Sequence, residues 1–167
     1  MKSKWTVKKV IKEIVILLLM LFVISMGMNY LRQPELKEDL YQWKIVDINN
    51  SYIDFEAYKG EPLVVHFWAT WCPTCKFEAK NIECISHKHN VVSIAVNSGS
   101  DDELHAFMQK NKLHYSVVND NHGELAKKMG IEVYPTTIIY DAEGKIKFSE
   151  VGYTTTVGLA TRLKLIN

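Results

Sequence analysis

The sequence predicts an α/β domain in which helices flank a central mixed β-sheet, behind an N-terminal apolar helix. Two apolar runs of strand length, at 62–69 and 91–96, are each followed by helical periodicity, which is typical of parallel strands joined by crossover helices. Strands at 136–141 and 145–151 flank Glu143-Gly144, a turn that predicts antiparallel pairing. Near the N-terminus, residues 14–31 carry no charge.

The other elements follow from local signals. Asn49-Asn50 is a turn dipeptide between two short alternating segments, which predicts a small hairpin. Pro73 favours a helix start, so we expect a helix over about 73–86, with an inner face of Phe77, Ile82 and Ile85. Three further elements are expected: a helix at 101–111, an extended stretch at 115–119 and a short helix at 122–129 ended by Gly130. A last helix begins near Thr154 and carries Val157, Leu159, Leu163 and Ile166.

The uncharged segment 14–31 is predicted to be a transmembrane anchor. As a helix it spans about 27 Å, close to the hydrocarbon thickness of a bilayer. Lysines precede it, at positions 2, 4, 8, 9 and 12, so residues 1–13 are expected in the cytoplasm. The domain, residues 41–167, then follows a linker at 32–40 and lies in the periplasm, outside the inner (cytoplasmic) membrane. The alternative is a cleaved signal peptide with Ser25 and Gly27 at its end; in both cases the domain is exported.

Charge argues against one class of partner. Before Pro34 there are six Lys or Arg and one acid, and from Pro34 onward there are 14 basic and 18 acidic residues. The exported part is therefore mildly acidic and has no basic stripe, which argues against nucleic acid.

Two of the three cysteines, Cys72 and Cys75, form a C-x-x-C pair at the expected start of a helix. The helix N-terminus stabilises a thiolate at Cys72, which makes it the expected exposed nucleophile. Cys75 lies one turn further along, within disulfide reach and more buried, and is the expected resolving thiol. Three alternatives stay open: a structural disulfide, a zinc site and a cysteine hydrolase. Zinc needs four ligands and only Cys84 remains, while a hydrolase has no use for the second cysteine.

The stretch "FWATWCPTC" resembles the active-site signature of the thioredoxin superfamily, and the resemblance extends over nearly all of residues 40–167. More narrowly, it resembles the membrane-tethered, exported thiol–disulfide proteins of bacteria, which include the cytochrome c maturation reductants. This resemblance implies the thioredoxin fold and a redox-active Cys72–Cys75 disulfide. In "VYPTT" it implies a cis-proline at Pro135 that faces the pair, after Tyr134. A cis peptide leaves the preceding backbone groups free to pair with a substrate strand.

Two ionisable residues are candidates for tuning the pair. Glu78 matches an acidic residue of the anchored reductants and is expected to assist deprotonation of Cys75; the alternative is a charge on the helix surface. His66 occupies the strand position at which thioredoxins carry a buried acid. It is either a hydrogen-bonded core histidine or a group that tunes proton transfer. Substrate is expected to contact five residues around the pair: Trp71, Pro73, Thr74, Tyr134 and Thr136.

The second half, at 96–103, 117–136 and 151–165, is similar to the suppressor-of-copper-sensitivity protein D type. Cys84, His87 and His89 lie close together in the sequence, and sulfur and imidazole suit copper. The interpretation without a metal is that Cys84 is a half-buried free thiol, on the opposite side of its helix from the pair. A copper-handling protein on a thioredoxin scaffold is therefore the alternative function.

The resulting prediction is a membrane-tethered thiol–disulfide oxidoreductase that works outside the cytoplasm. It exchanges electrons through Cys72 and Cys75 and needs no dissociable cofactor or metal. Reduction of protein disulfides is the expected direction, and oxidation is the alternative. Its expected partners are protein thiol and disulfide substrates and a membrane electron donor of the thiol-reductase type.

Overall fold

The computed structural model describes residues 7–31 and 43–166, which belong to two compact units, Met1–Gln33 and Pro34–Asn167. The first unit contains α1 (Val7–Leu31), whose apolar side chains from Ile14 to Ile24 are exposed. Among the described residues, no helix is both long enough and apolar enough to cross a membrane. The expected linker at 32–40 and the first six residues of the expected cytoplasmic segment lie outside the described residues.

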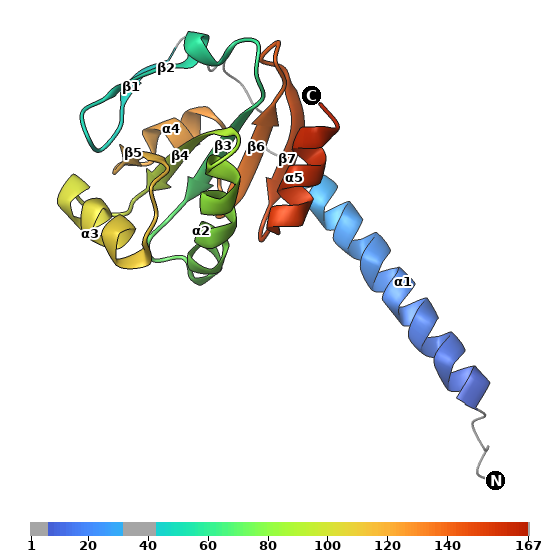
Figure 1. Ribbon diagram of the computed structural model, residues 1–167. Coiled ribbons are helices and arrows are strands. Elements are labelled where there is room, and N and C mark those ends of the chain that lie inside the picture. The colour runs from blue at the N-terminus through green and yellow to red at the C-terminus, as the bar shows by residue number, and fades with distance from the viewer. Residues whose placement is uncertain (1–6, 32–42, 167) are drawn as a thin grey trace. The chain divides into compact units, whose positions relative to one another are not determined.

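The second unit is built on a five-stranded mixed sheet with the order β5-β4-β3-β6-β7 (Figure 1). Its strands are β3 (Leu63–Trp68), β4 (Asn90–Val96), β5 (Ser116–Asp120), β6 (Thr136–Tyr140) and β7 (Ile146–Val151). The pairs β3–β4 and β4–β5 are parallel, whereas β3–β6 and β6–β7 are antiparallel. This confirms the predicted mixed sheet, because crossover helices join the parallel strands and a tight turn joins β6 to β7.

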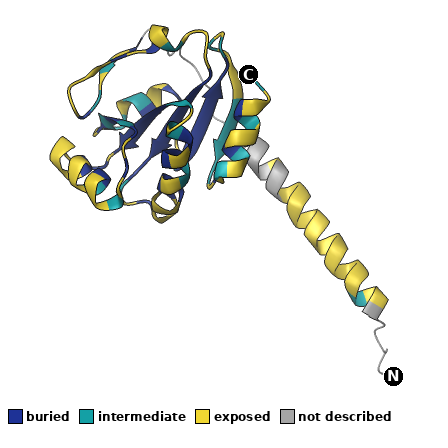
Figure 2. Ribbon diagram, in the orientation of Figure 1, coloured by how far each residue is buried: buried dark blue, intermediate teal, exposed yellow. Residues whose placement is uncertain are grey.

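Helices cover both faces of this sheet (Figure 1). The helices α2 (Pro73–Ser86), α3 (Asp101–Asn111) and α5 (Thr156–Lys164) bury apolar side chains in one cluster, and α4 (Glu124–Lys128) buries its own in a second cluster. The apolar side chains of β3 alternate between the two clusters, as expected for a pleated strand. All six of its residues are therefore buried, as the continuous apolar run predicted (Figure 2).

A small hairpin of β1 (Lys44–Val46) and β2 (Tyr52–Asp54), followed by the 3-10 helix η2 (Phe55–Tyr58), packs on the same cluster as α4. Its turn contains Asn50 at φ 59°, a left-handed conformation that asparagine tolerates better than most residues. The Asn49-Asn50 turn predicted from sequence is therefore confirmed.

Two apolar residues of the predicted helices are exposed, and one of them, Phe77, was expected on an inner face. Phe77 on α2 is 77% exposed and Val157 on α5 is 74% exposed. The inner face of α2 is formed by Cys75, Glu78, Ala79, Ile82 and Ile85. Phe77 precedes Glu78 by one residue, about 100° around the helix, so the burial of Glu78 turns Phe77 outward. On α5, Leu159 and Leu163 are buried as expected.

Candidate functional site

The site is centred on a disulfide between Cys72 and Cys75, whose Cα atoms lie 5.3 Å apart. Cys72 is the N-cap residue of α2, and its Sγ accepts a hydrogen bond of 3.2 Å from the backbone N–H of Cys75. Pro73 takes the first helical position, where its missing N–H has no partner to lose. When the disulfide opens, the same helix N-terminus offers its N–H groups and positive dipole end to a thiolate at Cys72.

Cys72 is less accessible than the sequence predicted. It is 6% exposed and Cys75 is 1% exposed, so the expected order of exposure holds but Cys72 is not an exposed side chain in this oxidised form. The physical reason is the loop before β6: Cys72 Sγ lies 3.7 Å from the carbonyl oxygen of Tyr134. A substrate sulfur must approach along the edge between this loop and α2.

The loop before β6 contains the cis peptide bond Tyr134–Pro135. The carbonyl oxygen of Pro135 accepts a hydrogen bond of 2.8 Å from the N–H of Gly152, which joins the loop to the end of β7. Thr136, predicted to contact substrate, is instead buried, and its hydroxyl donates to the carbonyl oxygen of Val133 at 2.7 Å. Its side chain faces the interior because β6 has already begun at this residue.

Trp71 forms the exposed wall beside the disulfide. It is 57% exposed, although its indole N–H donates to the carbonyl oxygen of Asn97 at 3.0 Å. Its ring meets that of Tyr134 edge-on, with the ring centroids 5.9 Å apart. Burial raises the pKa of Tyr134, and the negative charge of Asp120 adds to this. The two aromatic rings therefore form a fixed apolar surface, and Pro73 and Thr74 are also exposed beside it.

Glu78 is fully buried on the inner face of α2, one turn beyond Cys75, so the interpretation of this residue as a surface charge is wrong. Its Oε1 accepts a hydrogen bond of 3.1 Å from the backbone N–H of Thr154, while Oε2 has no hydrogen-bond partner. Burial raises the pKa of Glu78 from 4.5 to about 8, against the lowering effect of the Thr154 hydrogen bond. The carboxyl group therefore titrates in the range in which a thiol does.

His66 is a buried core histidine that is hydrogen-bonded and uncharged. Its Nδ1 lies 2.9 Å from the hydroxyl oxygen of Thr137 on the neighbouring strand β6. Burial lowers the pKa of His66 to about 3, so the imidazole carries no charge at neutral pH. Of these two candidates, Glu78 on α2 has a pKa close to that of a thiol, and His66 on β3 does not.

The possible metal ligands do not assemble. Cys84 is exposed, not half-buried, because its side of α2 points away from the sheet. Within residues 7–31 and 43–166, no three His, Cys, Asp or Glu side chains are grouped so that they could hold a metal ion. His87 Nε2 instead lies 3.6 Å from Oε1 of Glu83, which is one turn earlier on α2. The three residues of the copper hypothesis thus form no metal centre in the described part of the chain.

This geometry agrees with the comparison with known families. The redoxin family profile matches residues 43–162, which is most of the chain. The chain belongs to the redoxin family. It is a thioredoxin-like thiol–disulfide oxidoreductase, and its redox pair is Cys72 and Cys75.

Relatives of this redoxin support the same assignment. A thioredoxin-like protein of Haemophilus influenzae is 30% identical over 159 residues, which are 94% of this chain and 95% of that protein. Sporulation thiol-disulfide oxidoreductase A of Bacillus subtilis is 32% identical over 101 residues, which are 56% of this chain and 61% of that protein. The crystal structure of StoA from Bacillus subtilis superposes with a TM-score of 0.65 at 24% identity, covering 75% of this chain and 98% of that one. The redoxin domain therefore has the thioredoxin fold.

Sequence reasoning missed the residues that support the site from a distance. The carbonyl oxygen of Asn97 binds Trp71, which lies 26 residues earlier in the chain. The backbone N–H of Thr154 binds Glu78, which lies 76 residues earlier. Asn97 has φ 46°, and the turn-forming run Asn97-Ser98-Gly99-Ser100 was the signal that a fixed loop follows β4. No local signal marks Thr154, because its role depends on where α5 packs.

Proposed function

We propose that this redoxin is a membrane-tethered reductant of protein disulfides that works outside the cytoplasm. The observation that carries the proposal is the Cys72–Cys75 disulfide at the start of α2, with Glu78 buried one turn behind it. The combination provides a stabilised nucleophile, a resolving thiol and a proton acceptor within one helix.

The reducing half-reaction follows from this arrangement. The thiolate of Cys72 attacks a substrate disulfide, forms a mixed disulfide and releases the first substrate thiolate. Cys75 then loses its proton to Glu78 and attacks Cys72 Sγ, which releases the second substrate thiolate and closes the disulfide. Two electrons have passed to the substrate, whose thiolates take protons from solvent, and Glu78 keeps the proton of Cys75 until the disulfide is reduced again and Cys75 takes it back. A pKa of about 8 at Glu78 suits this transfer, since it lies close to that of an ordinary thiol.

Substrate recognition is assigned to the surface of Trp71 and Tyr134 around the disulfide. Trp71 is exposed and Tyr134 is half-buried, and aromatic side chains fixed in this way beside a reacting sulfur are typical of protein–protein contacts. The peptide group before Pro135 faces the pair and offers the substrate a backbone partner, in the manner of an added strand. Thr136 is excluded from this surface by its burial.

The tether and the location rest on the N-terminal sequence. The run 14–31 is uncharged and follows five lysines, and the apolar side chains that α1 exposes from Ile14 to Ile24 would lie in lipid. The domain would then act in the periplasm, with a membrane thiol reductase as its electron donor. The test fuses to the C-terminus a reporter enzyme that works only outside the cytoplasm. Activity of the fusion supports this topology, and an inactive fusion together with an active cytoplasmic reporter at the same position contradicts it.

Within the family we place the chain with the suppressor-of-copper-sensitivity protein D type, on the similarity of 96–103, 117–136 and 151–165. The assignment predicts that loss of the protein sensitises cells to copper through unreduced disulfides and not through lost copper binding. Rescue of copper tolerance by the full chain but not by its Cys72→Ser variant supports it. Rescue by both variants contradicts it.

The reduction potential of the Cys72–Cys75 pair tests the direction. The full chain with Cys84→Ser is equilibrated with thiol and disulfide buffers in detergent. A value near about −270 mV is expected for a reductant, and a value near about −120 mV would identify an oxidant and overturn the proposal. Insulin reduction that persists in Cys72→Ser would instead show that the disulfide is not the reacting group.

A further inference from the structure

Two buried polar atoms beneath α2 have no hydrogen-bond partner: Glu78 Oε2 and the hydroxyl oxygen of Tyr115. Glu78 is fully buried and Tyr115 is nearly so. Buried polar groups in native proteins are almost always paired, so two orphans on one side of a sheet need an explanation. One can donate a proton and the other can accept it.

Tyr115 is held under α2 by the loop that precedes β5. Both oxygens of Glu83 on α2 bind the residue before it: Oε2 accepts the backbone N–H of His114 at 2.7 Å and Oε1 lies 2.8 Å from His114 Nδ1. Lys80, also on α2, donates to the carbonyl oxygens of Asn111 and Lys112. Four hydrogen bonds from two adjacent turns of α2 therefore fix the segment that leads into Tyr115 against the helix.

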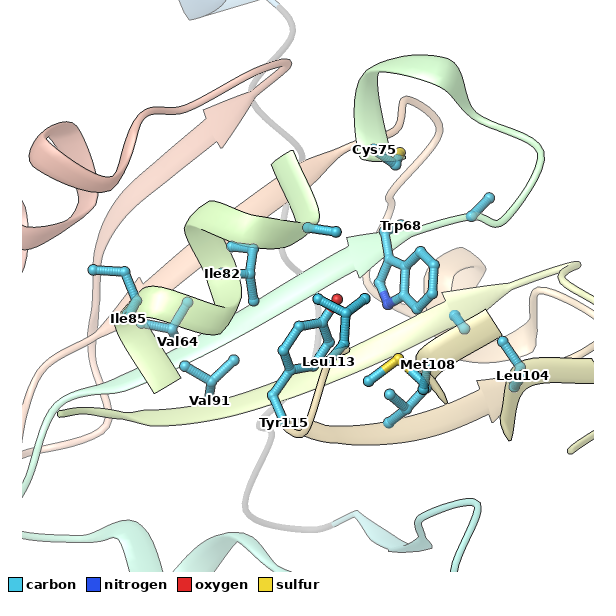
Figure 3. Close-up of a cluster of buried hydrophobic side chains, with 14 of the residues drawn as sticks. Val64, Trp68, Cys75, Ile82, Ile85, Val91, Leu104, Met108, Leu113 and Tyr115 are labelled. Carbon is cyan, nitrogen blue, oxygen red and sulfur yellow. The ribbon is translucent and has the colours of Figure 1, made fainter. Parts of the chain in front are cut away.

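The ring of Tyr115 runs from the start of β5 toward α2, with the hydroxyl end directed at the helix (Figure 3). It belongs to the same buried cluster as Ile82 and Cys75. Ile82 lies one helical turn after Glu78 and on the same side of α2, as their shared burial shows. The hydroxyl thus ends in the layer that also contains the Glu78 carboxyl group.

Electrostatics agree with this placement. Burial raises the pKa of Tyr115, and the negative charges of Glu83 and then Glu78 raise it further. The hydroxyl therefore keeps its proton at every working pH and is a permanent donor. The other groups near Glu78 donate no hydrogen bond to Oε2. The backbone N–H of Thr154 donates to Oε1, and His66 on β3 is uncharged and bonded to Thr137.

We propose that Tyr115 is a positioning residue for Glu78: its hydroxyl donates a hydrogen bond to Glu78 Oε2 when the carboxyl group gives up its proton. The bond forms directly or through one water molecule. The protonated acid of the oxidised protein does not need this donor, whereas the carboxylate that receives the proton of Cys75 does. Tyr115 thereby stabilises the basic form of Glu78 at the stage of the reaction that uses it. The inference rests on the proposed role of Glu78 as the proton acceptor.

The test measures the pKa of Glu78 in the full oxidised chain from the carboxyl 13C chemical shift, assigned by its loss in Glu78→Gln. In Tyr115→Phe the pKa is expected to rise by about one pH unit, as for loss of a hydrogen bond to a charged group. Resolution of a mixed disulfide at pH 7 is expected to slow about tenfold. Tyr140→Phe, a buried tyrosine of the other cluster, is the matched control and should change neither value.

A second measurement does not depend on the folding of a variant. Labelling the full chain with 3-fluorotyrosine makes each hydroxyl a stronger donor and is expected to lower the pKa of Glu78. An unchanged Glu78 pKa in both Tyr115→Phe and the labelled chain would overturn the inference.

The kinetics separate this failure from failure of the proposed function. If Glu78→Gln resolves the mixed disulfide at the wild-type rate, the base role of Glu78 is wrong, whatever the carboxyl shifts show. If Glu78→Gln is slow and Tyr115→Phe is not, the base role stands and the assignment of Tyr115 is wrong. In the double variant Glu78→Gln/Tyr115→Phe, the second change should add no further slowing.

Discussion

Replacing Glu78 with glutamine is expected to change how the stability of the oxidised protein depends on pH. Burial raises the folded pKa of Glu78 from 4.5 to about 8. Between these values the unfolded chain releases the proton and the folded protein keeps it. The folded state therefore binds more protons, and the free energy of unfolding contributed by this group falls as pH rises from about 4.5 to about 8.

The size of the effect follows from the same two values. Each unit of pKa difference between the folded and unfolded states corresponds to about 1.4 kcal/mol, so the full window amounts to up to about 4–5 kcal/mol. Glutamine has nearly the same shape as the protonated acid and does not titrate. The free energy of unfolding of Glu78→Gln is therefore expected to lie within about 1 kcal/mol of the wild-type value at pH 5. At pH 8 it is expected to exceed the wild-type value by about 4 kcal/mol. For a domain of this size that corresponds to roughly 10–15 °C in Tm.

Urea unfolding of the oxidised full chain, followed by tryptophan fluorescence at several pH values without reductant, measures this difference. All other titrating groups are shared by the two proteins and cancel. Glu132→Gln, at an exposed position, controls for the loss of one negative charge. If the free-energy curves of wild type and Glu78→Gln remain parallel from pH 5 to pH 8, Glu78 does not keep its proton in the folded protein and the reasoning is refuted.

Three further substitutions test other parts of the structure. Trp71→Ala should lower kcat/KM for a protein disulfide about tenfold and leave the reaction with dithiothreitol unchanged, since the ring contacts the partner and not the sulfur chemistry; equal loss with both reagents would contradict this. Ile82→Ala should lower the free energy of unfolding by about 2–5 kcal/mol in urea, because the side chain is completely buried; a cost below about 1 kcal/mol would place it outside the core. Cys84→Ser should change the free energy of unfolding by less than about 0.5 kcal/mol and leave insulin reduction intact, because Cys84 is exposed; lost activity would reveal a role for this thiol.

Helix limits could be predicted well because their signals are local. The expected helix at 73–86 is α2, and the expected helix at 101–111 is α3. Pro73 begins the first, and a capping box between Ser100 and Glu103 begins the second. A cap depends on residues within one turn of the chain, so sequence alone contains the information.

Helix faces were harder to predict. The prediction placed Phe77 and Cys84 too far inward. Periodicity identifies a set of apolar positions, but α2 buries Glu78 in preference to the neighbouring Phe77. Only the position of α5, whose preceding loop supplies the Thr154 N–H, makes burial of a carboxyl group there possible.

The sequence by itself determined the class of chemistry: a C-x-x-C pair at a helix start, a proline before a later strand, and an α/β order of elements. These features are set by residues a few positions apart, and the redoxin profile and the disulfide confirm the oxidoreductase assignment. The tertiary structure decided the electrostatics of the site. The raised pKa of Glu78, the neutrality of His66 and the place of Tyr115 under α2 each depend on burial by segments far away in the chain. The physical reason is that a pKa responds to the dielectric and the hydrogen bonds around a group, and those exist only after the sheet and its helices have packed.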